Sequence, residues 1–319
     1  MTKKIGCVIF FFILIISSIF IGIAHLPLFD LETWTHQDHL IFLASRLPRT
    51  LSLIIAGASI SIAGLTIQNL MQNKFVSPNT TGTIDSAKLG IVFVMIFLPN
   101  ASLFTRTAVA FAFAFIGTGL FLLLSRYLPQ KNIILIPLVG IMFGNIIGSV
   151  ATFFAYRYQL LQNMGSWLQG NFSTVTRGSY ELLYLSIPLF FIIYTFAHHF
   201  TIMGAGQDMA LGLGIPYQRM LILGIGILSL SSSIVLVSVG NIPFLGIIIP
   251  NLVSLKFGDQ MKKNLPLTAY FGACFLLTCD MIGRVIIAPY EISASLIAGI
   301  LGSICFIGML IKENRRYAS

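Results

Sequence analysis

The stretch Met203-GAGQDMALGLGIPYQ-Arg219 interrupts a chain that otherwise consists almost entirely of long apolar segments. Gly206, Gly212, Gly214 and Pro216 favour turns over a continuous helix. Between them lies a short apolar group, which consists of Met209, Ala210, Leu211 and Leu213. We interpret this group as an apolar knob suited to a groove on a cytoplasmic partner. The alternative is an ordinary glycine-rich turn between two helices.

The composition is typical of a polytopic membrane protein. Of the 319 residues, 56% are hydrophobic and only 9% are charged, whereas about a quarter of the residues in a soluble domain are charged. Because a helix needs about 20 apolar residues to cross the hydrocarbon core, the chain has room for roughly eight to ten spans. We therefore expect a single membrane domain over residues 1–319.

Ten apolar runs are candidate membrane helices. The first follows Lys3 and Lys4 but lacks an Ala-x-Ala cleavage site, so we interpret it as an uncleaved helix. The third and eighth runs are shorter than a perpendicular helix requires, and each is either a full span or a re-entrant segment. The ten runs are Ile5 to Ala24, Thr50 to Met71, Ile84 to Leu98, Thr107 to Ser125, Ile133 to Ala155, Glu181 to His198, Met220 to Val239, Ile242 to Leu255, Leu265 to Ile287 and Ala294 to Ile311.

The excess of basic residues, 19 against 10 acidic ones, is interpreted as a topology signal, and no nucleic-acid partner is expected. With ten spans and both termini cytoplasmic, every external cation is an arginine: Arg46, Arg49, Arg106, Arg157, Arg177 and Arg284. The count of charges on each side does not separate this model from one with two re-entrant segments. Since the guanidinium fork suits carboxylates, the outer face could dock an acidic partner. For Arg106, Arg157 and Arg177 we prefer anchoring among lipid headgroups.

The chain carries few candidates for metal or catalytic chemistry. The four cysteines lie in apolar segments without metal-binding spacing. The loop from His25 to His39 holds six His, Asp and Glu side chains, which we interpret as a solvated polar loop in preference to a metal site. A phosphate-binding loop, an H-E-x-x-H motif and a G-x-S-x-G motif are all missing. We therefore expect no cofactor and no enzymatic activity, and any ATP would be hydrolysed by another subunit.

Two spans carry faces of small residues. The second span is rich in small side chains from Ala56 to Gly64, and the fifth has Gly140, Gly144 and Gly148 at four-residue spacing. Such faces allow helix backbones to approach closely. They predict a compact bundle and, taken alone, indicate no function.

Several motifs follow one another along the chain. Residues 46–51 read RLPRTL, residues 72–90 read QNKFVSPNTTGTIDSAKLG, and residues 167–170 read WLQG. Residues 242–251 read IPFLGIIIPN, followed by GD at 258–259, DMIGR at 280–284 and EIS at 291–293. In these motifs and in the stretch 206–214, the chain resembles the FecCD family. That family comprises the permease subunits of ABC importers that carry iron-siderophores, haem and cobalamin into bacteria.

The resemblance implies an all-α polytopic membrane protein with about ten transmembrane helices and the BtuC-like fold of type II ABC importers. It places the chain in the bacterial cytoplasmic membrane with both termini cytoplasmic. The implied partners are a substrate-binding lipoprotein, two copies of an ABC ATPase and a second permease subunit, which is either identical or related. Asn251 stands where many members have histidine, which favours the iron-siderophore branch, including catecholate types, over haem or cobalamin.

The resemblance also implies three sets of site residues. Arg46, Arg49 and Arg284 resemble the periplasmic-side arginines that receive glutamates of the binding lipoprotein. The loop at about 200–219 resembles the coupling helices that fit a cleft on the ATPase, with Gly206, Met209, Ala210, Leu211, Leu213 and Gly214 as the coupling residues. The segment from Asn73 to Ser77 resembles the cytoplasmic gate, in which we select Asn73 and Phe75.

A second hypothesis is an ion-coupled secondary transporter. Asp85 with Lys88, and Asp280 with Arg284, form ionisable pairs at helical spacing inside predicted spans. Such pairs more often neutralise each other, and we find no internal repeat with midplane charges. We therefore prefer an ABC permease driven by a separate ATPase. It should lack a high-affinity pocket, because a tightly held substrate would not be released.

Overall fold

The computed structural model describes residues 2–22, 35–128 and 134–318, most of which are helical. Each of the ten predicted spans corresponds to a helix, and the described residues form no named strand. The all-α fold class is therefore confirmed. The ten helices are α1 (Thr2–Phe20), α3 (Leu47–Leu70), α4 (Thr83–Phe97), α5 (Leu103–Ser125), α6 (Leu135–Arg157), α8 (Ser186–Gly204), α10 (Tyr217–Val239), α11 (Leu245–Phe257), α12 (Met261–Val285) and α13 (Ala294–Ala318).

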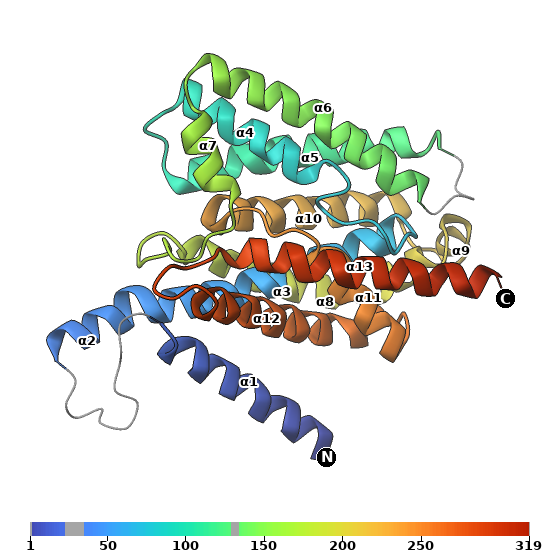
Figure 1. Cartoon of the computed structure of the whole chain (residues 1–319). Helices are drawn as coiled ribbons and strands as arrows, with labels where there is room; N and C mark the ends of the chain where they lie inside the picture. Colours follow the sequence, from blue (N-terminus) through green and yellow to red (C-terminus); the bar gives the residue numbers. More distant parts are fainter. Residues whose placement is uncertain (1, 23–34, 129–133, 319) are drawn as a thin grey trace.

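Three short α-helices lie outside this set. They are α2 (His36–Ile41), α7 (Leu161–Leu168) and α9 (Gln207–Gly212). Helices α2 and α9 lie at opposite ends of the bundle, and the C-terminal part of α13 lies at the α9 end (Figure 1). We call these two ends of the bundle the α2 end and the α9 end.

Helix α3 forms the centre of the bundle because its small residues permit close backbone contact. A Cβ at Gly57 would lie 2.6 Å from the carbonyl oxygen of Gly272, and a Cβ at Gly64 would lie 1.9 Å from that of Gly246. Helices α12 and α11 therefore pack directly against the α3 backbone. The predicted small-residue face of the second span thus forms the core of the molecule.

Helix α4, with 15 residues, and α11, with 13, are shorter than the six helical segments that are long enough to cross a membrane. The segment 71–82 before α4 is largely buried, and its polar groups bond to one another. For example, the backbone N–H of Ser77 donates to Thr80 Oγ1 at 2.8 Å. Irregular backbone is tolerated at membrane depth where protein surrounds it. In Figure 1 this segment returns into the bundle, and α4 continues to the α2 end.

Helices α4, α5 and α6 form a separate layer beyond α10 (Figure 1). Of the six segments long enough to cross a membrane, α6 is the least buried, with 22% of its apolar stretch buried. One side of α6 packs on α4 and on α7, and much of the rest faces outward. Much of the α6 surface therefore faces surroundings outside this chain.

At the α2 end the structure differs from the sequence-based prediction in one detail. His36, Asp38 and His39, predicted to lie in a solvated loop, belong to α2. Thr35 caps this helix, because its Oγ1 accepts from the Asp38 backbone N–H at 3.3 Å, and its own backbone N–H donates to Asp38 Oδ2 at 2.9 Å. His25, Asp30 and Glu32 lie outside the described residues. Within the described ranges, no three His, Cys, Asp or Glu side chains group as metal ligands.

Candidate transport site

Helix α9 presents an exposed apolar surface at one end of the bundle. Met209, Leu211 and Leu213 are 55%, 53% and 59% exposed. Gly206 has φ +132° before the helix and Gly214 has φ +75° after it, and both conformations favour glycine. The predicted knob is therefore a short helix between two glycine turns.

Ala210 does not belong to the exposed surface, although the sequence analysis grouped it with its apolar neighbours. Its side chain is fully buried in an apolar cluster that includes Met203, Ile215 and Met220. Successive residues on a helix are rotated by about 100°, so one residue of a short apolar run faces inward while the next faces outward. Ala210 thus attaches α9 to the bundle.

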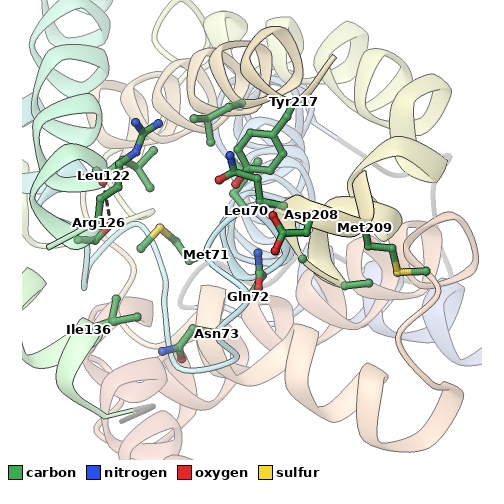
Figure 2. A pocket seen from close by; sticks show the side chains of 15 residues that line it. Leu70, Met71, Gln72, Asn73, Leu122, Arg126, Ile136, Asp208, Met209 and Tyr217 are labelled. Carbon is green, nitrogen blue, oxygen red and sulfur yellow. Dashed lines mark hydrogen bonds between the residues drawn. The ribbon is translucent and has the colours of Figure 1, made fainter. Parts of the chain in front are cut away.

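A cavity of about 620 Å³ lies between α9 and the ends of α3, α5 and α10. Figure 2 shows Asp208 of α9 and Arg126 after α5 on opposite sides of this space, with Asn73 and Tyr217 also facing it. The cavity separates α9 from the segment that follows α3.

The predicted gate segment is held by contacts with α11 and α13. The Asn73 side chain is buried and its Oδ1 accepts from the Phe75 backbone N–H at 2.9 Å. The Phe75 ring meets Phe306 of α13 edge-on, with 6.0 Å between the ring centroids. Asn251 Nδ2 donates to the Lys74 carbonyl at 2.7 Å. Asn251, which the sequence analysis linked to substrate class, thus also fastens the gate segment to α11.

An exposed ion pair adds a second fastening. Lys74 Nζ lies 3.0 Å from Asp259 Oδ1, and Ser254 donates to the same carboxylate. Burial raises the pKa of Asp259, but the hydrogen bonds from Ser254 and Lys74 outweigh it and lower the pKa below its ordinary value. The pair is more than half exposed, so it contributes little to global stability and acts mainly on the position of the segment.

The three arginines predicted as a docking site come together at the α2 end. Arg46, Arg49 and Arg284 are only 7%, 7% and 4% exposed, and two acidic side chains join them. Arg49 Nη2 lies 2.8 Å from Asp280 Oδ1, and its Nη1 lies 2.7 Å from Glu291 Oε2. Arg284 pairs with the other oxygen of Asp280. We call these five residues the arginine cluster.

The arginine cluster differs from the open set of cations that the sequence predicted. Arg49 already has both carboxylates of the cluster, and Arg46 donates to the Ile21 carbonyl at 2.6 Å. Buried charges are stable only when they are paired, which explains why acids accompany the arginines. Three guanidinium groups against two carboxylates still leave one net positive charge. The docking role of these arginines stays a prediction.

The ion pair of Glu291 and the bond between Asn251 and Lys74 were not predicted from the sequence. Both Glu291 and Asp280 stand in motifs quoted above, and acidic residues near predicted docking arginines were the available signal. Of the two predicted intramembrane pairs, both form: Arg284 with Asp280, and Lys88 with Asp85 at 2.9 Å. The second pair lies in α4, away from both ends of the bundle.

These features define a polytopic helical permease with an exposed short helix at one end and a charged cluster at the other. The model of the FecCD transport family matches residues 7–312. The chain belongs to the FecCD transport family.

Similarity to proteins with described roles extends over nearly the whole chain. The petrobactin import system permease protein YclN of Bacillus subtilis (strain 168) is 49% identical, over 95% of this chain and 96% of its own. The ferric-anguibactin transport system permease protein FatD of Vibrio anguillarum is 38% identical, over 95% and 96%. The vitamin B12 import system permease protein BtuC of Vibrio cholerae is 29% identical, over 94% and 91%.

A solved structure shares the fold. It is an ABC transporter described as metal-chelate type, in an inward-facing conformation, and it superposes with a TM-score of 0.81 over 98% of this chain and 99% of that one. At 21% identity the likeness concerns the fold alone. It agrees with the permease fold implied by the sequence motifs.

Proposed function

We propose that this chain is the membrane-spanning permease subunit of an ABC importer for iron(III)-siderophores. The observation that carries the proposal is the 49% identity, over 95% of the chain, to a petrobactin import permease. A second siderophore permease follows at 38%, whereas a vitamin B12 permease reaches 29%. Haem or cobalamin import is the alternative within the same family.

The geometry supports a division of labour between the two ends. The α9 end, with its three exposed apolar side chains, is the proposed contact for a cytoplasmic ATPase, present in two copies. The α2 end, with the positively charged arginine cluster, is the proposed docking face for an acidic binding lipoprotein. Both termini would then be cytoplasmic, in the cytoplasmic membrane of a bacterium. A second permease, identical or related, would complete the path.

The proposed transport step couples α9 to the gate segment. Closure of the ATPase pair would displace α9, and the displacement would reach Asn73, which lines the cavity, and through it Phe75. Release of the gate segment from α11 would open the path toward the cytoplasm. Because the binding protein holds the substrate with high affinity, the permease needs only weak contacts along the path.

Uptake into vesicles tests the proposal. Vesicles with an inside-out orientation are excluded first. The importer is assembled from this chain, its ATPase and its binding protein. It is then supplied with ferric petrobactin, haem or cobalamin. We expect ATP-dependent uptake of the iron chelate alone. Uptake driven by a proton or sodium gradient without ATP would instead support the secondary transporter. Preferential uptake of haem or cobalamin would keep the ABC mechanism and overturn the substrate class.

The ion-coupled alternative has little support at Asp280. Its two carboxylate oxygens are occupied by Arg49 and Arg284, so a proton would have to displace a guanidinium group. A coupling carboxylate needs access to water and freedom to change its charge. The arrangement favours a structural or docking role for this residue.

A further inference from the structure

The ion pair in α4 lies beside a groove that the transport scheme above does not use. The space has a volume of about 580 Å³ and lies between α4, α6 and α7. Asp85 and Lys88 line it from α4, and Asn145, Ser149 and Thr152 line it from α6. We call this space the α4–α6 groove.

Two glycines of α6 make room for the acidic member of the pair. A Cβ at Gly144 would lie 2.6 Å from Asp85 Oδ2, and a Cβ at Gly148 would lie 3.6 Å from Oδ1. These residues belong to the glycine face that the sequence analysis interpreted as helix-packing glue. Part of that face instead accommodates a carboxylate, so the charged pair is built into the contact between α4 and α6.

The polar wall of the groove faces outward. Asn145, Ser149 and Thr152 are exposed and lie on one side of α6, at positions i, i+4 and i+7. The hydroxyls of Ser149 and Thr152 donate to carbonyls of their own helix, both at 2.8 Å, which leaves their oxygens available as acceptors. The side chains of Asp85 and Lys88 are 21% and 19% exposed. An ion pair and three polar groups facing hydrocarbon would be costly, so this side must meet water or polar groups.

The chemistry of the pair suits weak contact with an anion. In the described part of the chain, the Lys88 ammonium donates to Asp85 at 2.9 Å, and an ammonium has three donors in all. Lys88 itself lines the groove, so its other donors are available there. Because Asp85 neutralises the charge of Lys88, an anion would gain hydrogen bonds from the ammonium without being bound tightly by a net positive charge. Conduction along a path requires contacts of this weak kind.

We propose that Lys88, with Asp85 as its counter-ion, is a weak transit contact for the oxygen-rich, anionic iron(III) chelate on a water-filled side of α6. This inference rests on the proposed function for the identity of the cargo. Siderophores hold iron(III) through oxygen atoms of catecholate, hydroxamate or carboxylate groups, and these oxygens are acceptors for the ammonium. Access of water to the groove can be tested without any cargo.

The first test measures water access with two adjacent cysteines. In a variant without the four native cysteines, Ser149→Cys faces the groove, whereas Val150→Cys lies at the same depth on another side of α6. We expect a charged, water-soluble thiol reagent to modify the assembled importer at least tenfold faster at position 149. Equal rates, or lower reactivity at position 149, would mean that lipid or protein fills the groove and would overturn the proposal.

The second test separates contact with cargo from a structural ion pair. Uptake of ferric petrobactin by Lys88→Gln should fall about tenfold, the loss expected for one hydrogen bond to a charged group, while Lys88→Arg retains most activity. The neutral double variant Asp85→Asn/Lys88→Gln restores an uncharged hydrogen-bonded pair. If Lys88 contacts the chelate, the double variant stays as defective as Lys88→Gln. Recovery to the wild-type rate would show that the pair is only structural.

The controls distinguish this inference from the proposed function. Each variant is first checked for copurification with the ATPase and for ATP hydrolysis in the absence of cargo, neither of which should change. If the wild-type importer takes up no iron chelate, the proposed cargo is wrong, and the cysteine labelling still decides whether the groove is wet. If wild-type uptake is normal and Lys88→Gln is equally active, the transit contact is refuted and the proposed function stands.

Discussion

At the scale of single residues, Arg49 connects three parts of the chain. It binds Asp280, which lies 231 residues away in sequence, and Glu291, which lies 242 residues away. The two contacts join α3 to α12 and to the segment before α13. Arginine suits this position because its planar fork serves two carboxylates at once, which the single point charge of lysine does not.

Loss of Arg49 should therefore destabilise the fold before it affects docking. Arg49→Met leaves Glu291 without its cation and Asp280 with Arg284 alone, and breaking a buried pair in this way costs about 3–5 kcal/mol. Thermal unfolding of the purified protein in detergent measures the loss. Arg177→Met, at an exposed arginine near the same end, is the control and should unfold like the wild type. Equal stability of the two variants would contradict the importance of the buried pairs.

The link between Lys74 and Asp259 predicts a pH dependence at the gate segment. The pKa of Asp259 is lowered in the folded protein. The stability that its ionised carboxylate gives to the gate segment is therefore fully present above its ordinary pKa and is lost as the pH falls through the lowered value. Labelling of Gln72→Cys, in a variant without the native cysteines, should thus stay constant from neutral pH down to about pH 5 after correction for thiol ionisation. Asp259→Asn should already label faster at neutral pH. A wild-type increase near pH 6 would point to another group.

At the scale of one element, α9 combines an inward-facing and an outward-facing apolar side chain within four residues. Ala210 fixes the helix to the bundle, while Leu213 lies free on its outer side. Substitution with aspartate at the two positions should therefore give different defects. This difference separates a coupling helix from an ordinary turn.

Leu213→Asp should fold normally and fail to hold the ATPase. Burial of a leucine at an interface contributes roughly 1.5–3 kcal/mol, and the new carboxylate would be buried without a partner. Ala210→Asp places the charge inside the bundle and should lower the thermal stability of the permease itself. Copurification of the ATPase and the unfolding temperature measure the two effects. If Leu213→Asp retains the ATPase and takes up cargo as the wild type does, α9 is not the coupling site. The coupling site would then be sought in the turn that contains Asp259.

At the scale of the whole molecule, the two ends differ in chemistry. The α9 end carries exposed apolar side chains and the C-terminal part of α13, and the α2 end carries the arginine cluster (Figure 1). This polarity makes the proposed orientation in the membrane testable at one site on each end. The two sites must label from opposite sides.

Single cysteines in a variant without the native four test this topology. Ser173→Cys, exposed near the α2 end, should react with an impermeant reagent in intact cells with a permeable outer layer. Leu213→Cys should react only after the cytoplasmic membrane is opened. The reverse pattern would show that the protein has the opposite orientation in the membrane. The proposed ATPase contact and docking face would then lie on the wrong sides.

Local properties of the sequence determined much of this protein. The positions of the ten helices follow from apolar runs, because helix formation in a membrane satisfies the backbone within each segment. The exposed α9 follows from its glycines and proline, and the motifs indicated the family to which the chain belongs. Glycine spacing predicted close helix contacts, which α3 makes with α11 and α12.

Only the tertiary structure decided how distant side chains meet. No pattern in the sequence indicates that Ala210 turns inward, that Asp280 and Glu291 both pair with Arg49, or that Gly144 makes room for Asp85. Each of these facts depends on the distance between atoms of different helices, and pairing of buried charges is decided by that distance and by the loss of water around them. Helix periodicity places a residue on a face of its own helix, but packing determines what that face meets.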